Sequence, residues 1–136
     1  MDKLGWDMAH KQAKMKKILV LVGDLLFASR IEGTLAACAY DVHTAPATAE
    51  AATIAREWEP DGIVISFGIS SQDWEHAIRA IRAEESLAET PLLAFGPHVD
   101  TAGRAAATAA GATRVITNGA FFNRMPDAIA ALIRSK

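Results

Sequence analysis

The stretch Pro60–Gly68, PDGIVISFG, decides the fold class of this chain. Its centre, Gly62–Ser66, is an apolar run of strand length, and Pro60 and Asp61 stop the helical pattern that precedes it. A continuously apolar strand is typical of a parallel sheet with both faces covered. The polar run after Gly68 has a helical pattern, so the stretch predicts a strand, a loop and a helix.

The same alternation of strand and helix extends along the chain from Lys17 onward. Strands are expected at 17–22, 41–45, 62–66, 91–95 and 113–117, and helices at 25–40, 48–59, from about 70, and at 101–112 and 123–134. Five strands alternating with five helices imply right-handed crossovers and a parallel sheet between two helix layers. By analogy with chains of this length, we expect an α/β, flavodoxin-like three-layer sandwich with a five-stranded parallel sheet of order 2-1-3-4-5.

Composition and charge exclude several classes of protein. A chain of 136 residues that is 51% hydrophobic and 22% charged is typical of one globular domain. Its net charge of -2 gives no electrostatic case for binding nucleic acid or an anionic membrane surface. No apolar run reaches the ~18 residues of a membrane span, and the start lacks the apolar block of a signal peptide. We therefore expect a cytoplasmic protein without membrane contact.

Two further features concern the organisation of the chain. Residues 1–14 are polar and lack a strand or helix pattern, and we interpret them as an N-terminal extension before a domain at 15–136. The single cysteine, Cys38, excludes an intrachain disulfide and a zinc cluster. Its place in an apolar helical pattern predicts a buried side chain.

Four segments give the chain a resemblance to a known family. They are KKILVLVGD (16–24), PDGIVIS (60–66), TPLLAFG (90–96) and AAGATRVITNGAFF (109–122). Together with the element lengths, they make residues 16–135 similar to the receiver domain of bacterial response regulators. The resemblance implies the flavodoxin-like fold, a place in two-component or phosphorelay signalling, and a signalling protein as partner.

The resemblance also implies where receiver chemistry would lie. Receivers hold Mg²⁺ with an acidic pair after strand one and phosphorylate an aspartate at the end of strand three. A Ser/Thr ends their fourth strand and a lysine ends their fifth. The matching positions in this sequence are Gly23 and Asp24 for the acidic pair, Ser66 for the aspartate, Gly96 for the Ser/Thr and Asn118 for the lysine.

These departures predict a degenerate receiver, or pseudo-receiver, that lacks aspartyl phosphorylation. Asp24 with water molecules should bind Mg²⁺ weakly, and the Ser66 hydroxyl is a poor nucleophile without an adjacent base. Gly96 and Asn118 remove the hydroxyl and the cation that would meet the phosphoryl charge. We therefore expect a non-catalytic domain, with neither a metal nor another cofactor, that acts through protein contacts.

An alternative function uses the same edge of the sheet. Open parallel sheets bind ligands at the carboxyl ends of their strands, where Ser66, His98 and Asp100 are expected. Either these residues bind a small polar or anionic ligand, or Asp100 or Thr101 caps a helix while His98 is an exposed loop residue. The stretch VISFG lacks the first glycine of a hydrolase nucleophile elbow, and Gly23, Gly62 and Gly68 do not form a dinucleotide fingerprint, which argues against an enzyme.

The segment 101–124 contains the candidate interface. The helix expected at 101–112 has small side chains and one arginine, Arg104, and it adjoins Phe121, Phe122 and Arg124. Phenylalanine and arginine are enriched at interfaces, and the receivers that this chain resembles often pair through their fourth helix, fifth strand and fifth helix. We therefore predict a homodimer through this face. In the alternative interpretation, one or both phenylalanines pack under the last helix.

Overall fold

The computed structural model describes residues 15–67 and 73–135, so the predicted extension at 1–14 lies outside the described residues. Its sheet has five strands in the order β2-β1-β3-β4-β5, and every neighbouring pair is parallel. The order 2-1-3-4-5 expected from the sequence is therefore confirmed. The strands are β1 (Lys17–Leu21), β2 (Asp41–Ala45), β3 (Gly62–Ser66), β4 (Leu92–Gly96) and β5 (Arg114–Thr117).

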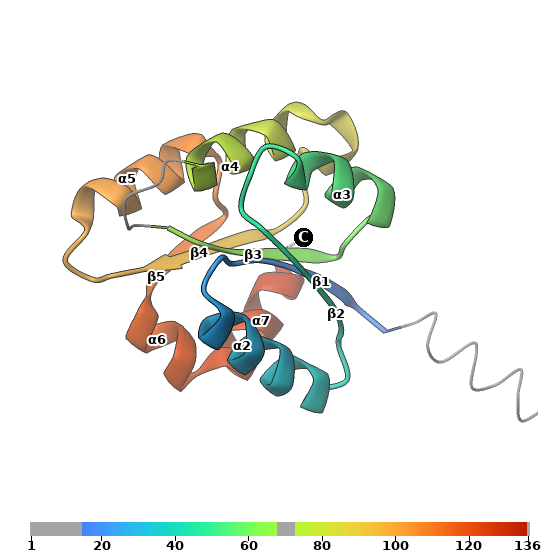
Figure 1. The fold of residues 1–136 in the computed structure, drawn as a ribbon, viewed down its shortest axis with the longest axis vertical. Helices are drawn as coiled ribbons and strands as arrows, with labels where there is room; N and C mark the ends of the chain where they lie inside the picture. Colours follow the sequence, from blue (N-terminus) through green and yellow to red (C-terminus); the bar gives the residue numbers. More distant parts are fainter. Residues whose placement is uncertain (1–14, 68–72, 136) are drawn as a thin grey trace, which may run out of the picture.

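Helices cover both faces of the sheet, which is the middle of three layers (Figure 1). One face is covered by α2 (Leu25–Ala37), α6 (Asn118–Asn123) and α7 (Met125–Arg134). The other is covered by α3 (Ala51–Trp58), α4 (Asp73–Ala83) and α5 (Thr101–Ala110), with a 3-10 turn, η1 (Glu85–Leu87), after α4. This arrangement is the flavodoxin-like sandwich.

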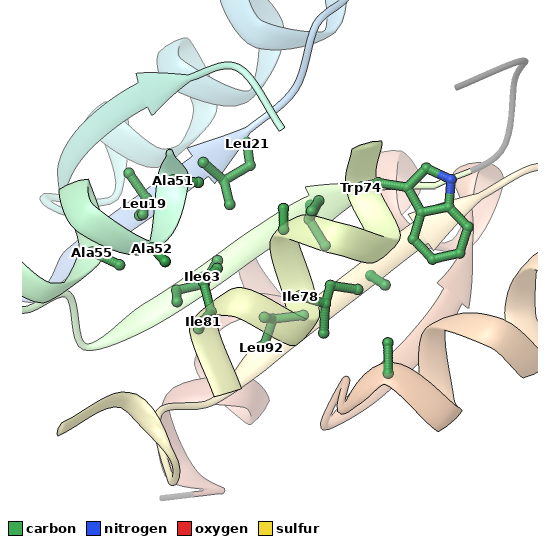
Figure 2. Packing of buried hydrophobic residues seen from close by; sticks show 14 of the residues in the cluster. Leu19, Leu21, Ala51, Ala52, Ala55, Ile63, Trp74, Ile78, Ile81 and Leu92 are labelled. Carbon is green, nitrogen blue, oxygen red and sulfur yellow. The ribbon is translucent and has the colours of Figure 1, made fainter. Parts of the chain in front are cut away.

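Each face of the sheet has its own hydrophobic core, because successive strand side chains point to opposite faces. In β1, Leu19 and Leu21 pack with α3 and α4, whereas Ile18 and Val20 pack with α2 and α7. Figure 2 shows the first of these cores. Burial on both faces explains why the central strands are apolar throughout.

The side chain of Arg82 joins three segments at the edge where β4 and β5 begin. Its guanidinium donates to the backbone oxygens of Leu87, Thr90 and Gly111 over distances of 2.9, 2.7 and 2.9 Å. It also donates to the Thr113 hydroxyl at 3.3 Å. Burial lowers the pKa of Arg82 from its ordinary value, and the hydrogen bonds compensate for the lost water contacts.

Two local expectations are corrected by the structure. Cys38 is exposed instead of buried, because α2 ends at Ala37 and Cys38 is the residue that terminates it. The last helical segment, expected as one helix at 123–134, is two helices, α6 and α7. The Thr117 hydroxyl accepts the Ala120 N–H and starts α6, and Pro126 lies in the first turn of α7.

Candidate functional site

A cleft of about 430 Å³ lies at the edge where the parallel strands end. All five strands contribute to it, either through a terminal residue or through the segment that follows the strand. Its apolar lining residues are Phe27, Pro46, Ala47, Phe67, Trp74 and Pro97, and its polar ones are Asp24, Thr48, Ser66, Asp73 and Asn118, with Gly23 beside them. The structure therefore brings together Asp24, Ser66 and Asn118, as their places at strand ends predicted.

The Asp24 carboxylate organises the start of α2. Its Oδ1 accepts the backbone N–H groups of Leu26 and Phe27 at 2.8 and 3.1 Å. These hydrogen bonds satisfy two N–H groups of the first helical turn and fix the orientation of the carboxylate. Asp24 thus stabilises the helix and also presents negative charge to the cleft.

The residues of the cleft do not fit the magnesium site that the receiver fold implies. One oxygen of Asp24 is already held by two N–H groups, and the adjacent position is Gly23, which has no side chain. Asp73 is a second carboxylate of the lining. Across residues 15–67 and 73–135, no group of three or more His, Cys, Asp or Glu side chains is arranged to hold a metal ion.

Ser66 and Asn118 present uncharged polar groups at two strand ends. Ser66 is the last residue of β3 and Asn118 is the first residue of α6, directly after β5. Both side chains are half-buried, and neither makes a hydrogen bond within the described part of the chain. Among residues 15–67 and 73–135, no base therefore lies within hydrogen-bond distance of Ser66 to activate its hydroxyl as a nucleophile.

The Phe67 ring packs directly against the backbone of Gly96. A Cβ atom at Gly96 would lie 2.6 Å from Cε2 of the Phe67 ring, closer than van der Waals contact allows. Phe67 is 2% exposed and packs against Trp74, with ring centroids 5.8 Å apart. The ring thus occupies the space beside the position where the receiver resemblance expects a hydroxyl side chain. The sequence analysis missed Phe67, because alternation along a strand does not indicate which way the residue after its end turns.

The structure places His98 and Asp100 outside this cleft. His98 is exposed and lines an adjoining depression with Thr117 and Gly119, and this depression shares Pro97 and Asn118 with the cleft. Asp100 caps α5, since its Oδ1 accepts the Gly103 N–H at 2.8 Å. Ser66 and His98 therefore line neighbouring depressions, and Asp100 acts as the helix cap that the alternative interpretation of this loop expected.

The four candidate interface residues differ in exposure. Phe121 is fully buried and stacks on Phe95 with centroids 4.4 Å apart, so it belongs to the core and not to a surface. Phe122 is half-buried, with Arg30 lying over its ring. Arg104 is half-buried on α5, and Arg124 is exposed and pairs with Asp127 at 2.9 Å.

Three large apolar side chains are exposed beside the cleft. Leu25 and Leu26 follow Asp24 in the first turn of α2 and are 84% and 80% exposed. Val99, two residues after Pro97 of the cleft lining, is 75% exposed. The sequence analysis missed all three, although the adjacent leucines at a helix start were a visible signal.

Solved structures of receiver domains are similar to this chain. They include the chemotaxis protein CheY4 of Vibrio cholerae (19% identity, 87% of this chain and 98% of that one, TM-score 0.76). A second is the receiver domain of a sensor histidine kinase from Pseudomonas aeruginosa, whose structure has a magnesium ion coordinated in the active-site cleft (21%, 88% and 98%, 0.76). A third is a response regulator protein from Burkholderia multivorans (25%, 87% and 94%, 0.68).

These likenesses define the fold of the chain. It has the CheY-like, receiver-domain form of the flavodoxin-like fold, which confirms the resemblance stated from the sequence at the level of fold. No protein-family model and no curated protein matches the chain. Within the described residues, no helix has the length and apolar character needed to cross a membrane.

Proposed function

We propose that this chain is a regulatory signalling domain that accepts no phosphoryl group and acts through contact with a protein partner. The supporting observation is the charge of the cleft. Asp24 and Asp73 line it, and the described lining residues include no lysine, arginine or histidine. Phosphoryl transfer requires cations that meet the negative charge of the transferred group, and the Asp24 carboxylate of the cleft repels that charge.

The other differences from the receiver pattern also disfavour phosphoryl transfer. Ser66 stands where the resemblance expects the phosphoacceptor, and Phe67 fills the space beside Gly96. Asn118 supplies an uncharged carboxamide in place of a lysine. The domain therefore keeps the receiver scaffold and uses it without covalent modification of the strand-three end.

Beryllofluoride provides a direct test of this proposal, because it binds aspartate carboxylates as a mimic of a phosphoryl group. We expect no bound fluorine resonance when the wild-type domain is mixed with Mg²⁺ and beryllofluoride. The matched control is the triple variant Gly23→Asp, Ser66→Asp, Asn118→Lys, which restores three receiver side chains. A Cβ at Gly23 meets no atom within 4 Å, so the backbone there has room for the added side chain. A bound signal in the wild type would refute the proposal.

Partner contact is also proposed, and the exposed apolar side chains support it. Leu25 and Leu26 are adjacent in the first turn of α2, so together they expose continuous apolar area that a protein partner would cover, and Val99 is exposed in the loop after β4. A homodimer is proposed through a different face, formed by α5, β5 and the last helical segment, which the structure divides into α6 and α7; α5, β5 and α6 lie together in Figure 1. Arg104 and Arg124 belong to this side, and Phe121 no longer does.

Sedimentation velocity tests the homodimer. We expect a dimer mass for the wild type and a monomer mass for Arg104→Glu, because a symmetric interface carries the substitution on both sides and the reversed charge would repel the groups that complement the arginine. Arg79→Glu, on exposed α4 surface, is the matched control and should leave the mass unchanged. A monomeric wild type, or an Arg104→Glu dimer, would rule out this face.

A further inference from the structure

We propose that the cleft binds a small organic molecule with a flat apolar body and a cationic end, such as an aromatic amine. The proposal concerns the same cleft as the proposed function and goes beyond it, since a domain that accepts no phosphoryl group need not bind any ligand there. The evidence lies in the shape, the apolar walls and the charge of the cleft.

The size of the cleft and the chemistry of its walls favour an apolar ligand body. Its volume of about 430 Å³ falls within the range of small-molecule sites, roughly 300–1,000 Å³. Phe27 from α2, Trp74 from α4, and Pro46 and Pro97 from two loops supply flat apolar surface. Flat aromatic ligands bind between such surfaces by burial and by offset or edge contacts of the rings.

Two of these walls are already held in place by packing. The Phe27 ring lies 4.8 Å from that of Phe122 and 6.2 Å from that of Phe95. Trp74 is 8% exposed and contacts Phe67, and Figure 2 shows its indole at one end of the core cluster, extending from the first turn of α4. A site with preformed walls loses little conformational entropy when a ligand enters.

The polar groups of the cleft favour a ligand that carries positive charge and donates hydrogen bonds. Asp24 binds two backbone N–H groups through Oδ1 alone, and its Oδ2 makes no hydrogen bond within the described part of the chain. The Ser66 hydroxyl and the Asn118 carboxamide are likewise available as acceptors. An ammonium group near a carboxylate and aromatic faces gains both charge attraction and cation–π attraction.

The same groups disfavour the anionic ligand considered from the sequence. A helix N-terminus usually attracts an anion, but α2 begins with the Asp24 carboxylate as its cap and α4 begins at Asp73. The positive N-terminal ends of both helices therefore already have a carboxylate of the chain beside them. His98, the side chain expected to bind an anion, lines the adjoining depression instead of the cleft.

Three indole probes that differ only in the group on their side chain test the proposal. They are tryptamine, which is cationic, tryptophol, which is neutral, and indole-3-acetate, which is anionic. Each is titrated into the full-length domain and followed by two-dimensional ¹H–¹⁵N spectra, with the Trp74 indole N–H assigned through Trp74→Phe. We expect saturable shifts at Gly23, Ser66 and the Trp74 indole with a millimolar dissociation constant for tryptamine, weaker binding of tryptophol, and none of indole-3-acetate.

Two variants test the charge without disturbing the fold. Asp24→Asn keeps a side-chain oxygen that caps α2 and removes the charge, so tryptamine should bind about two- to fivefold more weakly. Tryptophol should bind this variant as it binds the wild type. Asp127→Asn, which removes an exposed carboxylate outside the cleft, is the matched control and should change neither affinity.

Each outcome decides the proposal. Shifts confined to the cleft, in the order tryptamine, tryptophol, indole-3-acetate, and reduced for tryptamine in Asp24→Asn would support it. The absence of cleft shifts with all three probes, tightest binding of indole-3-acetate, or shifts centred elsewhere would overturn it. The beryllofluoride experiment reports on the proposed function separately, since a fluorine signal there would refute that function and leave these titrations to be read independently.

Discussion

Replacing Gly96 with alanine tests whether the Phe67 ring packs so closely against residue 96 that only glycine fits there. The new Cβ would stand 2.6, 2.7 and 2.8 Å from Cε2, Cδ2 and Cζ of Phe67. The ring is 2% exposed and is held against Trp74, so it cannot turn into solvent without losing its packing. The substitution should therefore destabilise the domain, although alanine restricts the unfolded chain more than glycine does.

The magnitude follows from two opposing contributions. Overpacking a filled core costs about 1–3 kcal/mol of unfolding free energy. Gly→Ala gains about 0.4–1 kcal/mol by reducing the entropy of the unfolded chain. The net effect of Gly96→Ala is a loss of about 0–2.6 kcal/mol, and the midpoint of about 1.3 kcal/mol lowers the melting temperature by roughly 3–8 °C in a domain of this size.

A double-mutant cycle with Phe67→Val separates the contact from general effects. Valine lacks all three ring atoms that the new Cβ meets, so in this background Gly96→Ala should be neutral or stabilising by up to about 1 kcal/mol. Urea unfolding of the four proteins measures the coupling energy, which we expect to be about 1–3 kcal/mol. Additive effects, or a stabilising Gly96→Ala in the wild-type background, would refute the reasoning.

Three further substitutions have outcomes that urea unfolding can check. Gly33→Ala lies in α2, where a Cβ meets no atom within 4 Å, and should stabilise by about 0.5–1 kcal/mol; a loss would mean that α2 is packed differently. Asp24→Ala removes the cap of α2 and should cost about 1 kcal/mol, whereas Asp24→Asn should cost little; equal losses would argue against the cap. Arg82→Met leaves three backbone oxygens without their charged donor and should lower the free energy of unfolding by about 2–4 kcal/mol, and Arg82→Lys should lose less. An Arg82→Met variant of unchanged stability would contradict the stabilising role of these hydrogen bonds.

The strands were predictable because burial on both faces leaves a strong signal in the sequence, whereas their order was expected only by analogy with flavodoxin-like chains of this length. The apolar run of β3 and the positions of Asp24, Ser66 and Asn118 at strand ends follow from parallel topology, which places all carboxyl ends at one edge. The short helix α6 was not predicted, because its six residues, Asn118–Asn123, are too few to show a helical period.

The walls of the cleft could not be predicted from periodicity. Trp74 lies on the buried face of α4, which helical periodicity can indicate, but its second role as a wall of the cleft depends on where α4 begins relative to β3. Phe67 follows the last strand residue, and only the space left by Gly96 on the neighbouring strand determines that its ring turns inward. Contacts between neighbouring strands are long-range properties that a single sequence does not record as a local pattern.

Incubation with acetyl phosphate and Mg²⁺, read by intact mass, tests the central claim most directly. We predict that the wild-type domain keeps its unmodified mass, while a phosphorylatable receiver treated in parallel gains a phosphoryl group. A stoichiometric mass increase of one phosphoryl group on the wild-type domain, abolished by Ser66→Ala, would contradict the account.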